Sequence, residues 1–94
     1  MITNKYEAAM IFSVKNGDEG VAALNEKFKA LIEANGTIES VDEWGKRHLA
    51  YPINDETEGF YVFVNFTAGT DFPVEFERIA GITDGVLRLM ITRK

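Results

Sequence analysis

Residues 60–68, with the sequence FYVFVNFTA, constrain the fold more than any other part of the chain. One set of alternate positions is entirely apolar, and the other set holds two aromatic residues and an asparagine. A strand that is apolar on both faces is typical of the middle of a sheet. We therefore predict a central strand, with one set of side chains in the core and the other on the opposite face. The core set is Phe60, Val62, Val64 and Phe66, and the opposite set is Tyr61, Phe63 and Asn65.

Three further segments are predicted to be strands. Residues 5–14 and 86–94 alternate apolar and mixed side chains, and residues 37–53 make a longer strand. Gly45 is expected to bend or bulge this long strand. Pro52 has no N–H to donate, so it fits only an edge strand or a strand end.

Two segments have helical periodicity. The first begins at Asp18, and Asn35 and Gly36 are expected to end it because both tolerate the left-handed conformation of a helix end. Residues 69–81 form a shorter helix, with Asp71 as its cap. The apolar stripe of the first helix is Val21, Leu24, Phe28, Leu31 and Ile32, and its polar side is Asn25, Glu26, Lys29 and Glu33.

The order of these segments is strand, helix, strand, strand, helix, strand. This order predicts one α+β domain over residues 1–94, a ferredoxin-like βαββαβ sandwich. Two helices would cover one face of a four-stranded antiparallel sheet. The other face would stay open, where folds of this kind commonly meet partners.

The charge balance argues against a protein that binds nucleic acid by charge alone. The 94 residues carry 15 acidic and 10 basic side chains, for a net charge of −5. The positions of the basic residues matter more than the sum, because six of them fall on predicted strands or strand ends. Both a basic patch and scattered edge charges fit this distribution. The six are Lys5, Lys46, Arg47, Arg88, Arg93 and Lys94.

Neither catalysis nor metal binding is indicated. The chain has one histidine and no cysteine, and its paired carboxylates are sequence neighbours that point to opposite faces of a strand. No spacing of histidine and carboxylates is typical of a metal site. We expect no enzyme activity, catalytic residue, metal, cofactor or small-molecule substrate. The first residues lack a secretory pattern and the apolar runs are short, so no membrane contact and a cytoplasmic location are expected.

The central strand also raises an RNA-binding alternative. An RNA-recognition motif has the same element order, and aromatic residues on its third strand stack on bases. Here Glu58 stands where that motif has a basic residue. If the core set packs beneath the helices, only Tyr61 and Phe63 remain as a platform for a protein or a base.

Residues 43–53, EWGKRHLAYPI, carry a more specific pattern. They resemble the signature of the bacterial small-subunit ribosomal protein six family, which has the form (L/W)-G-x-R-x-L-A-Y-P-I. The resemblance extends over the whole chain and includes Tyr6, Gly59, Tyr61 and Arg88. The family's fold is the ferredoxin-like one expected from the order of the segments.

The resemblance implies a structural constituent of the small ribosomal subunit. Family members bind the central domain of 16S rRNA as a heterodimer with small-subunit ribosomal protein eighteen, and they support subunit assembly and translation on the ribosome. Asn4 stands where many relatives have arginine. Of the RNA contacts that the resemblance implies, the one at the N-terminus is therefore the least well supported in this chain. Carried onto this chain, the expected RNA contacts are Lys5, Lys46, Arg47, His48, Arg88 and Arg93, and the expected partner contacts are Trp44, Tyr61 and Phe63.

Two other functions fit the same fold. One is a free-standing binder of single-stranded RNA, against which Glu58 counts. The other is a regulatory domain that binds a small ligand or dimerises through its open sheet. No ligand-pocket motif supports the regulatory domain, and the ribosomal interpretation remains the principal hypothesis.

Overall fold

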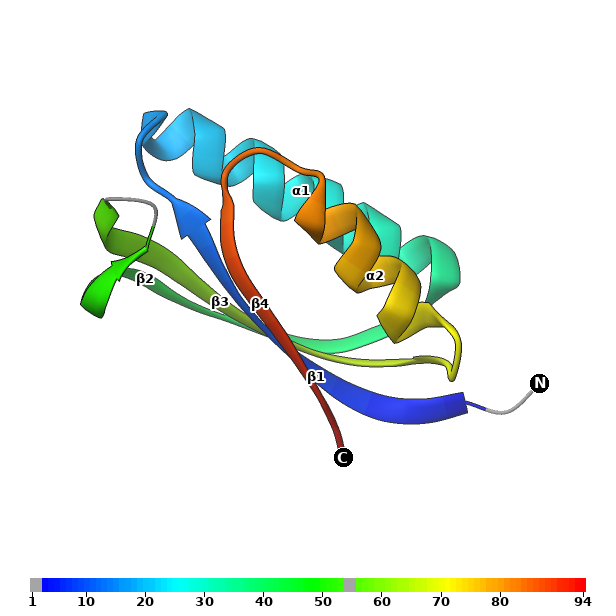
Figure 1. The fold of residues 1–94 in the computed structure, drawn as a ribbon. Coiled ribbons are helices and arrows are strands. Elements are labelled where there is room, and N and C mark those ends of the chain that lie inside the picture. Colours follow the sequence, from blue (N-terminus) through cyan, green and yellow to red (C-terminus); the bar gives the residue numbers. More distant parts are fainter. Residues whose placement is uncertain (1–2, 54–55) are drawn as a thin grey trace.

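The strands and helices follow one another in the predicted order. The computed structural model describes residues 3–53 and 56–94. Within these residues, extended and helical segments occur where the periodicities predict them (Figure 1). In chain order they are β1 (Thr3–Ser13), α1 (Gly17–Asn35), β2 (Gly36–Ile53), β3 (Glu56–Gly69), α2 (Phe72–Gly81) and β4 (Val86–Arg93).

The four strands form one antiparallel sheet. Their spatial order is β2-β3-β1-β4, so β2 and β4 are the edges and β3 lies inside the sheet. This confirms the central strand predicted for residues 60–68. Both helices lie on the same side of the sheet (Figure 1), so the predicted ferredoxin-like sandwich is confirmed.

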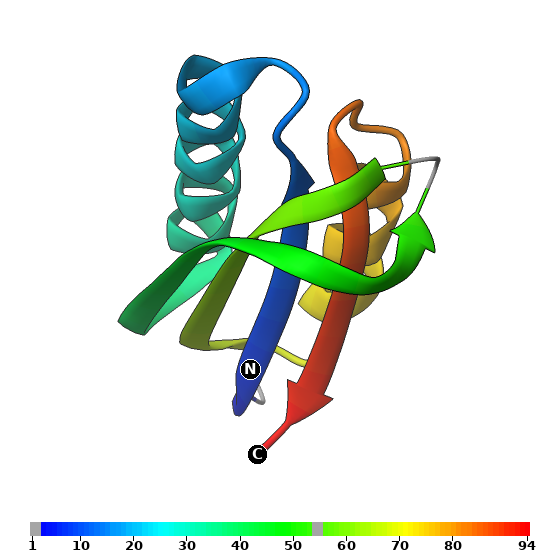
Figure 2. The same ribbon diagram turned by 90° about the vertical axis from the view of Figure 1, so that its left-hand side faces the viewer.

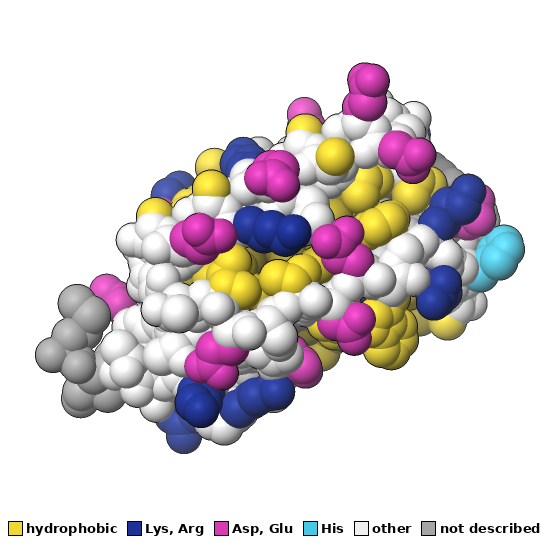
Figure 3. Space-filling view, turned by 180° about the vertical axis from the view of Figure 1, so that it is seen from behind, with side chains coloured by type: hydrophobic (Ala, Val, Ile, Leu, Met, Phe, Trp, Pro, Cys, Tyr) yellow, Lys and Arg dark blue, Asp and Glu magenta, His cyan; other side chains and the backbone are white. Residues whose placement is uncertain are grey.

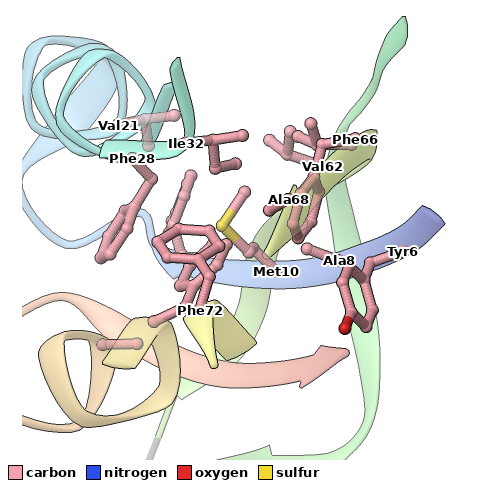
Figure 4. Close-up of a cluster of buried hydrophobic side chains, with 14 residues drawn as sticks. Tyr6, Ala8, Met10, Val21, Phe28, Ile32, Val62, Phe66, Ala68 and Phe72 are labelled. Carbon is pink, nitrogen blue, oxygen red and sulfur yellow. The ribbon is translucent and has the colours of Figure 1, made fainter. Parts of the chain in front are cut away.

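The core lies between the sheet and the two helices (Figure 4). Phenylalanine rings connect the layers: Phe12 of β1 stacks on Phe28 of α1 with ring centroids 5.9 Å apart, and Phe28 stacks on Phe76 of α2 at 5.7 Å. Stacked aromatic pairs add stability beyond the area they bury. The largest fully buried side chains are Phe12, Phe28, Phe66, Phe76, Met10, Ile32, Val62 and Val64.

The long strand β2 changes direction at Gly45, as predicted. Gly45 has a φ of 82°, a conformation that favours glycine, and the pairing with β3 shifts register between Glu43 and Gly45. Beyond this bulge, residues 46–53, which we call the β2 arm, sweep across the sheet (Figure 2). The Tyr51 hydroxyl lies 3.4 Å from Nη1 of Arg88 on β4, at the opposite edge. The face expected to be open is therefore partly covered by the β2 arm.

The ends of the helices differ from the prediction in two details. Gly36 is extended, with a φ of −176°, rather than left-handed. Its role is close approach, because a Cβ there would lie 2.0 Å from the backbone oxygen of Thr67. Asp71 occupies the cap position of α2, but its side chain makes no capping hydrogen bond. The positions of these two helix ends were therefore predicted correctly, but the left-handed conformation expected at Gly36 and the side-chain cap expected from Asp71 were wrong.

Asn25 was expected on the polar side of α1, and this was wrong. Only 8% of Asn25 is exposed, and it shares the buried stripe with Val21, Phe28 and Ile32. Spacings of four, seven and eleven residues from Val21 put all of these on one helix face. Its Oδ1 atom is buried and has no hydrogen-bond partner among the described residues.

Candidate nucleic-acid and partner interface

An aromatic pair lies on the side of the sheet away from the helices. The rings of Trp44 and Phe63 are 4.6 Å apart, and Trp44 Nε1 donates a hydrogen bond of 2.9 Å to Asp42 Oδ2. Asp42 pairs with Phe63 across the ladder, and the bulge before Gly45 adds one residue to β2. Asp42 and Trp44 are two residues apart, so the ordinary alternation of a strand puts both on this face, and the bulge then brings Gly45 opposite Tyr61 on the same face.

Next to this pair is an apolar hollow of about 270 Å³, which we call the open-face hollow. Tyr61 and Phe63 line it, so the structure brings together the three predicted partner-binding residues, Trp44, Tyr61 and Phe63. A concave apolar surface on a small protein is typical of a site that receives a partner's side chain. The hollow is lined by Ala9, Met10, Ile11, Tyr61, Phe63, Arg88 and Met90.

The β2 arm encloses a second, smaller hollow of about 170 Å³ against the sheet. Gly59 of β3 leaves room for β1, because a Cβ there would lie 2.4 Å from Ile11 Cγ2, whereas its 3.5 Å distance from Leu49 Cδ2 of the arm would be an ordinary contact. Glycine at this position therefore accommodates the Ile11 side chain, which lines the hollow. The lining residues are Ile11, Leu49, Ala50, Tyr51, Ile53, Tyr61 and Arg88.

Three of the predicted RNA contacts lie on the β2 arm, but they do not share one face. Lys46, Arg47 and His48 are all exposed and pair in turn with Phe60, Gly59 and Glu58 of β3. Successive residues of a strand point to opposite sides. Arg47 thus shares the open face with Arg88, while Lys46 and His48 point to the helix side at the sheet edge.

The other predicted RNA contacts are spread along β1 and β4. Arg88 pairs with Ile11, whereas Lys5 lies six residues earlier on β1, which corresponds to roughly 20 Å. Arg93 pairs with Tyr6, a core residue, so it points to the helix side. Lys5 and Arg88 are on adjacent strands, as expected, but the structure does not bring the six residues into one compact patch.

Several residues of this surface were not among the predicted site residues. Ile11 and Met90 line the open-face hollow, and Met90 is 52% exposed. Their positions opposite the core set were a usable signal, since the same alternation identified Tyr61. Tyr51, which is 61% exposed, was not among the predicted site residues either. Its contact with Arg88 depends on the path of the β2 arm, for which the sequence has no simple signal.

A titrating pair lies elsewhere, on the outer side of α2. Arg78 donates to Glu75 over 2.5 Å, and this hydrogen bond lowers the pKa of Glu75. Across residues 3–53 and 56–94, no cluster of three or more histidine or carboxylate side chains is arranged to hold a metal ion. No helix in the same part of the chain has the length and apolar character needed to cross a membrane.

Comparison with known families identifies the kind of protein. The sequence model of the family described as Ribosomal protein S6 matches residues 5–93. The chain belongs to this family. Its resemblance to the bacterial small-subunit ribosomal protein six family is therefore confirmed.

Individual relatives agree with this assignment. The small ribosomal subunit protein bS6 of Clostridium perfringens is 47% identical over 91 residues, which cover 96% of each chain. The bS6 protein of Alkaliphilus oremlandii is 50% identical over 90 residues, again 96% of each chain. The crystal structure of 30S ribosomal protein S6 from Thermotoga maritima superposes with a TM-score of 0.91 and 27% identity, covering 99% of this chain and 89% of that one.

Membership of the S6 family settles the class of function. This S6-family chain is a structural protein of the small ribosomal subunit, located on the cytoplasmic ribosome, and it is not an enzyme. The ribosomal hypothesis is thus preferred over a free-standing RNA binder and over a regulatory domain. RNA binding and a role in translation accord with this class.

Proposed function

We propose that this protein binds the central domain of 16S rRNA as a heterodimer with small-subunit ribosomal protein eighteen. In this role it supports subunit assembly and translation. The observation that carries the proposal is the open-face hollow, an apolar concave surface that lies beside the exposed, positively charged side chain of Arg88. Such a surface suits a protein partner and RNA at neighbouring positions.

The partner surface rests on Trp44, Tyr61 and Phe63. Trp44 is 49% exposed although its ring packs on Phe63, so much of its apolar area faces solvent in the isolated chain. Burial of exposed aromatic area stabilises an interface at roughly 25 cal/mol per Å² of apolar surface before the costs of association. Aromatic side chains of this kind are the usual sites of large energy in protein interfaces.

The RNA surface rests on exposed cations on an acidic body. A chain with a net charge of −5 gains little from long-range attraction to RNA, so a basic partner would supply much of the counterion release. The same negative charge favours pairing with a basic protein. The RNA contacts in this proposal are Lys5, Lys46, Arg47, His48, Arg88 and Arg93, of which Arg47 and Arg88 share the open face with the hollow.

A binding titration tests the proposal. A central-domain fragment of 16S rRNA is titrated with this chain, with small-subunit ribosomal protein eighteen, and with both, at about 50 and about 200 mM salt. We expect tight binding only with both proteins, with a slope of log affinity against log salt of about −0.7 to −0.9 per phosphate contact. Tight binding of this chain alone to unstructured single strands would contradict the proposal.

Two variants test the partner surface. Phe63→Ala is expected to weaken heterodimer formation by about tenfold or more, because it removes the ring that packs on Trp44 and also lines the open-face hollow. Val74→Ala is a matched control, since Val74 is an exposed apolar residue on α2, on the helix side of the sheet. Equal loss in both variants would place the partner elsewhere.

A further inference from the structure

A third hollow, of about 310 Å³, lies on the other side of the molecule, between α1 and the edge of the sheet. Figure 3 shows this side, where yellow apolar atoms are visible between acidic side chains in magenta. Its apolar lining comes from Val21 and Ala22 of α1 and Phe60 of β3. We call it the α1 groove, lined by Asp18, Val21, Ala22, Asn25, Glu26, Lys29, Glu43 and Phe60.

The rim of the α1 groove is negative. It carries three carboxylates and one ammonium, and the ammonium of Lys29 lies 3.5 Å from Glu43. Asp18 and Glu26 have no ion-pair partner within the described residues. Asp18 also lies in the first turn of α1, where an acid is favoured by the helix dipole. Glu26 has no such local role.

Asn25 is a second, independent feature of the groove. It lines the groove with only 8% of its surface exposed, and its Oδ1 has no hydrogen-bond partner among the described residues. A buried carbonyl without a donor is costly, so unsatisfied groups of this kind are uncommon in native structures. A side-chain amide can rotate to offer its oxygen to a cationic donor that enters the groove.

These features select the chemistry of the occupant. Carboxylates repel phosphate, so RNA is disfavoured at the rim of the groove itself. The apolar floor suits the aliphatic stem of a lysine or arginine, whose head would remain at the negative rim. Single exposed ion pairs contribute little, so useful affinity needs several linked contacts rather than one small cation.

We infer that the α1 groove is a docking site for a lysine- or arginine-rich segment of a protein partner. The aliphatic stem of one side chain lies on Val21, Ala22 and Phe60. Its cationic head lies at Glu26, and a second cation of the same segment reaches Asp18, because the two carboxylates are about 12 Å apart along α1. This inference is independent of the proposed function, because the groove is lined by none of the residues assigned to RNA or to the partner there.

The test is a nuclear magnetic resonance titration of the intact chain alone, without RNA. The probe is an acetylated, amidated nonapeptide that alternates lysine with glycine and alanine. At about 50 mM salt we expect saturable shifts at the amides around the groove and at the Asn25 side-chain amide. At about 500 mM salt, binding should weaken roughly tenfold or more, since exposed charges are screened.

Matched variants make the test specific. The double variant Asp18→Asn/Glu26→Gln is expected to weaken peptide binding about tenfold or more, and Asn25→Leu about threefold. The control Asp71→Asn/Glu77→Gln removes the same charge from α2 and its cap and should change binding less than about twofold. Circular dichroism verifies that each variant is folded.

Three results would overturn the inference. Equal weakening by both double variants would mean that only the net charge matters. The same saturable shifts with spermidine at equal concentration would identify a site for a small polyamine instead of a protein segment. An absence of shifts at the groove would mean that no basic segment docks there.

Discussion

The two faces of the central strand β3 share one backbone but differ in their environment. On the helix side, Val62, Val64 and Phe66 are completely buried against two helices. On the open side, Tyr61 and Phe63 remain partly exposed, although they are as apolar as a core requires. The difference teaches that alternation separates residues that stabilise the fold from residues available to a partner.

The sharpest test of this contrast is a pair of truncations on β3. Phe66→Ala leaves a cavity in the core and is expected to lower the free energy of unfolding by about 3–5 kcal/mol. Phe63→Ala mainly removes the pair with Trp44 and is expected to cost about 1 kcal/mol. Urea denaturation measures both values. Similar losses in the two variants would remove the distinction between the faces.

Gly59→Ala tests a place where the open side is tightly packed. The new methyl group would lie 2.4 Å from Ile11 Cγ2, and Ile11 is β-branched and turns little about χ1. We expect a loss of about 1–3 kcal/mol, because overpacking forces neighbours to shift. Thermal denaturation measures the loss. Gly81→Ala is the control, since nothing lies within 4 Å of the position that its new methyl group would take.

The double variant Arg47→Ala/Arg88→Ala tests whether the open-face cations belong to the fold at all. Both side chains are exposed, so we expect the free energy of unfolding to change by about 0.5 kcal/mol or less per site. Binding to the central-domain fragment, with the protein partner present, should weaken clearly. A large drop in melting temperature would show that these residues are structural.

The smallest expected effect comes from the outer side of the helix layer. Arg78 lowers the pKa of Glu75, so folding favours the ionised carboxylate. The stabilisation is present above the ordinary pKa of glutamate and is lost as the pH falls through the lowered value. Glu75→Gln should therefore be slightly less stable than the wild type at neutral pH and equal to it in strong acid. Melting temperatures at both pH values test this sign.

Most of the fold could be predicted because alternation and helical period are local properties. The two sets of residues on β3 and the bulge at Gly45 follow from residue type and spacing. Asn25 shows where this reasoning fails. Its polarity suggested the solvent side, whereas its spacing from Val21 and Phe28 put it on the buried stripe. In this case, geometry outweighed the preference of the side chain.

The candidate site was only partly predictable, for a different reason. Trp44, Tyr61 and Phe63 were identified, and the structure brings them together. The path of the β2 arm could not be predicted from the sequence, because the direction of a strand after a bulge depends on twist and packing over the whole sheet. The separation of Lys5 from Arg88 likewise requires the strand register, which a single sequence does not specify.

The contact between Tyr51 and Arg88 has a consequence for how two ligands communicate. Arg88 lines both hollows on the open face, and its guanidinium also donates to the Tyr51 hydroxyl of the β2 arm. A phosphate that binds the Arg88 guanidinium would compete with the Tyr51 hydroxyl for it. If the β2 arm then moved away from β4, the entrance to the open-face hollow would change. Two ligands would then be linked by a coupling free energy, and each would alter the affinity of the other by the same factor.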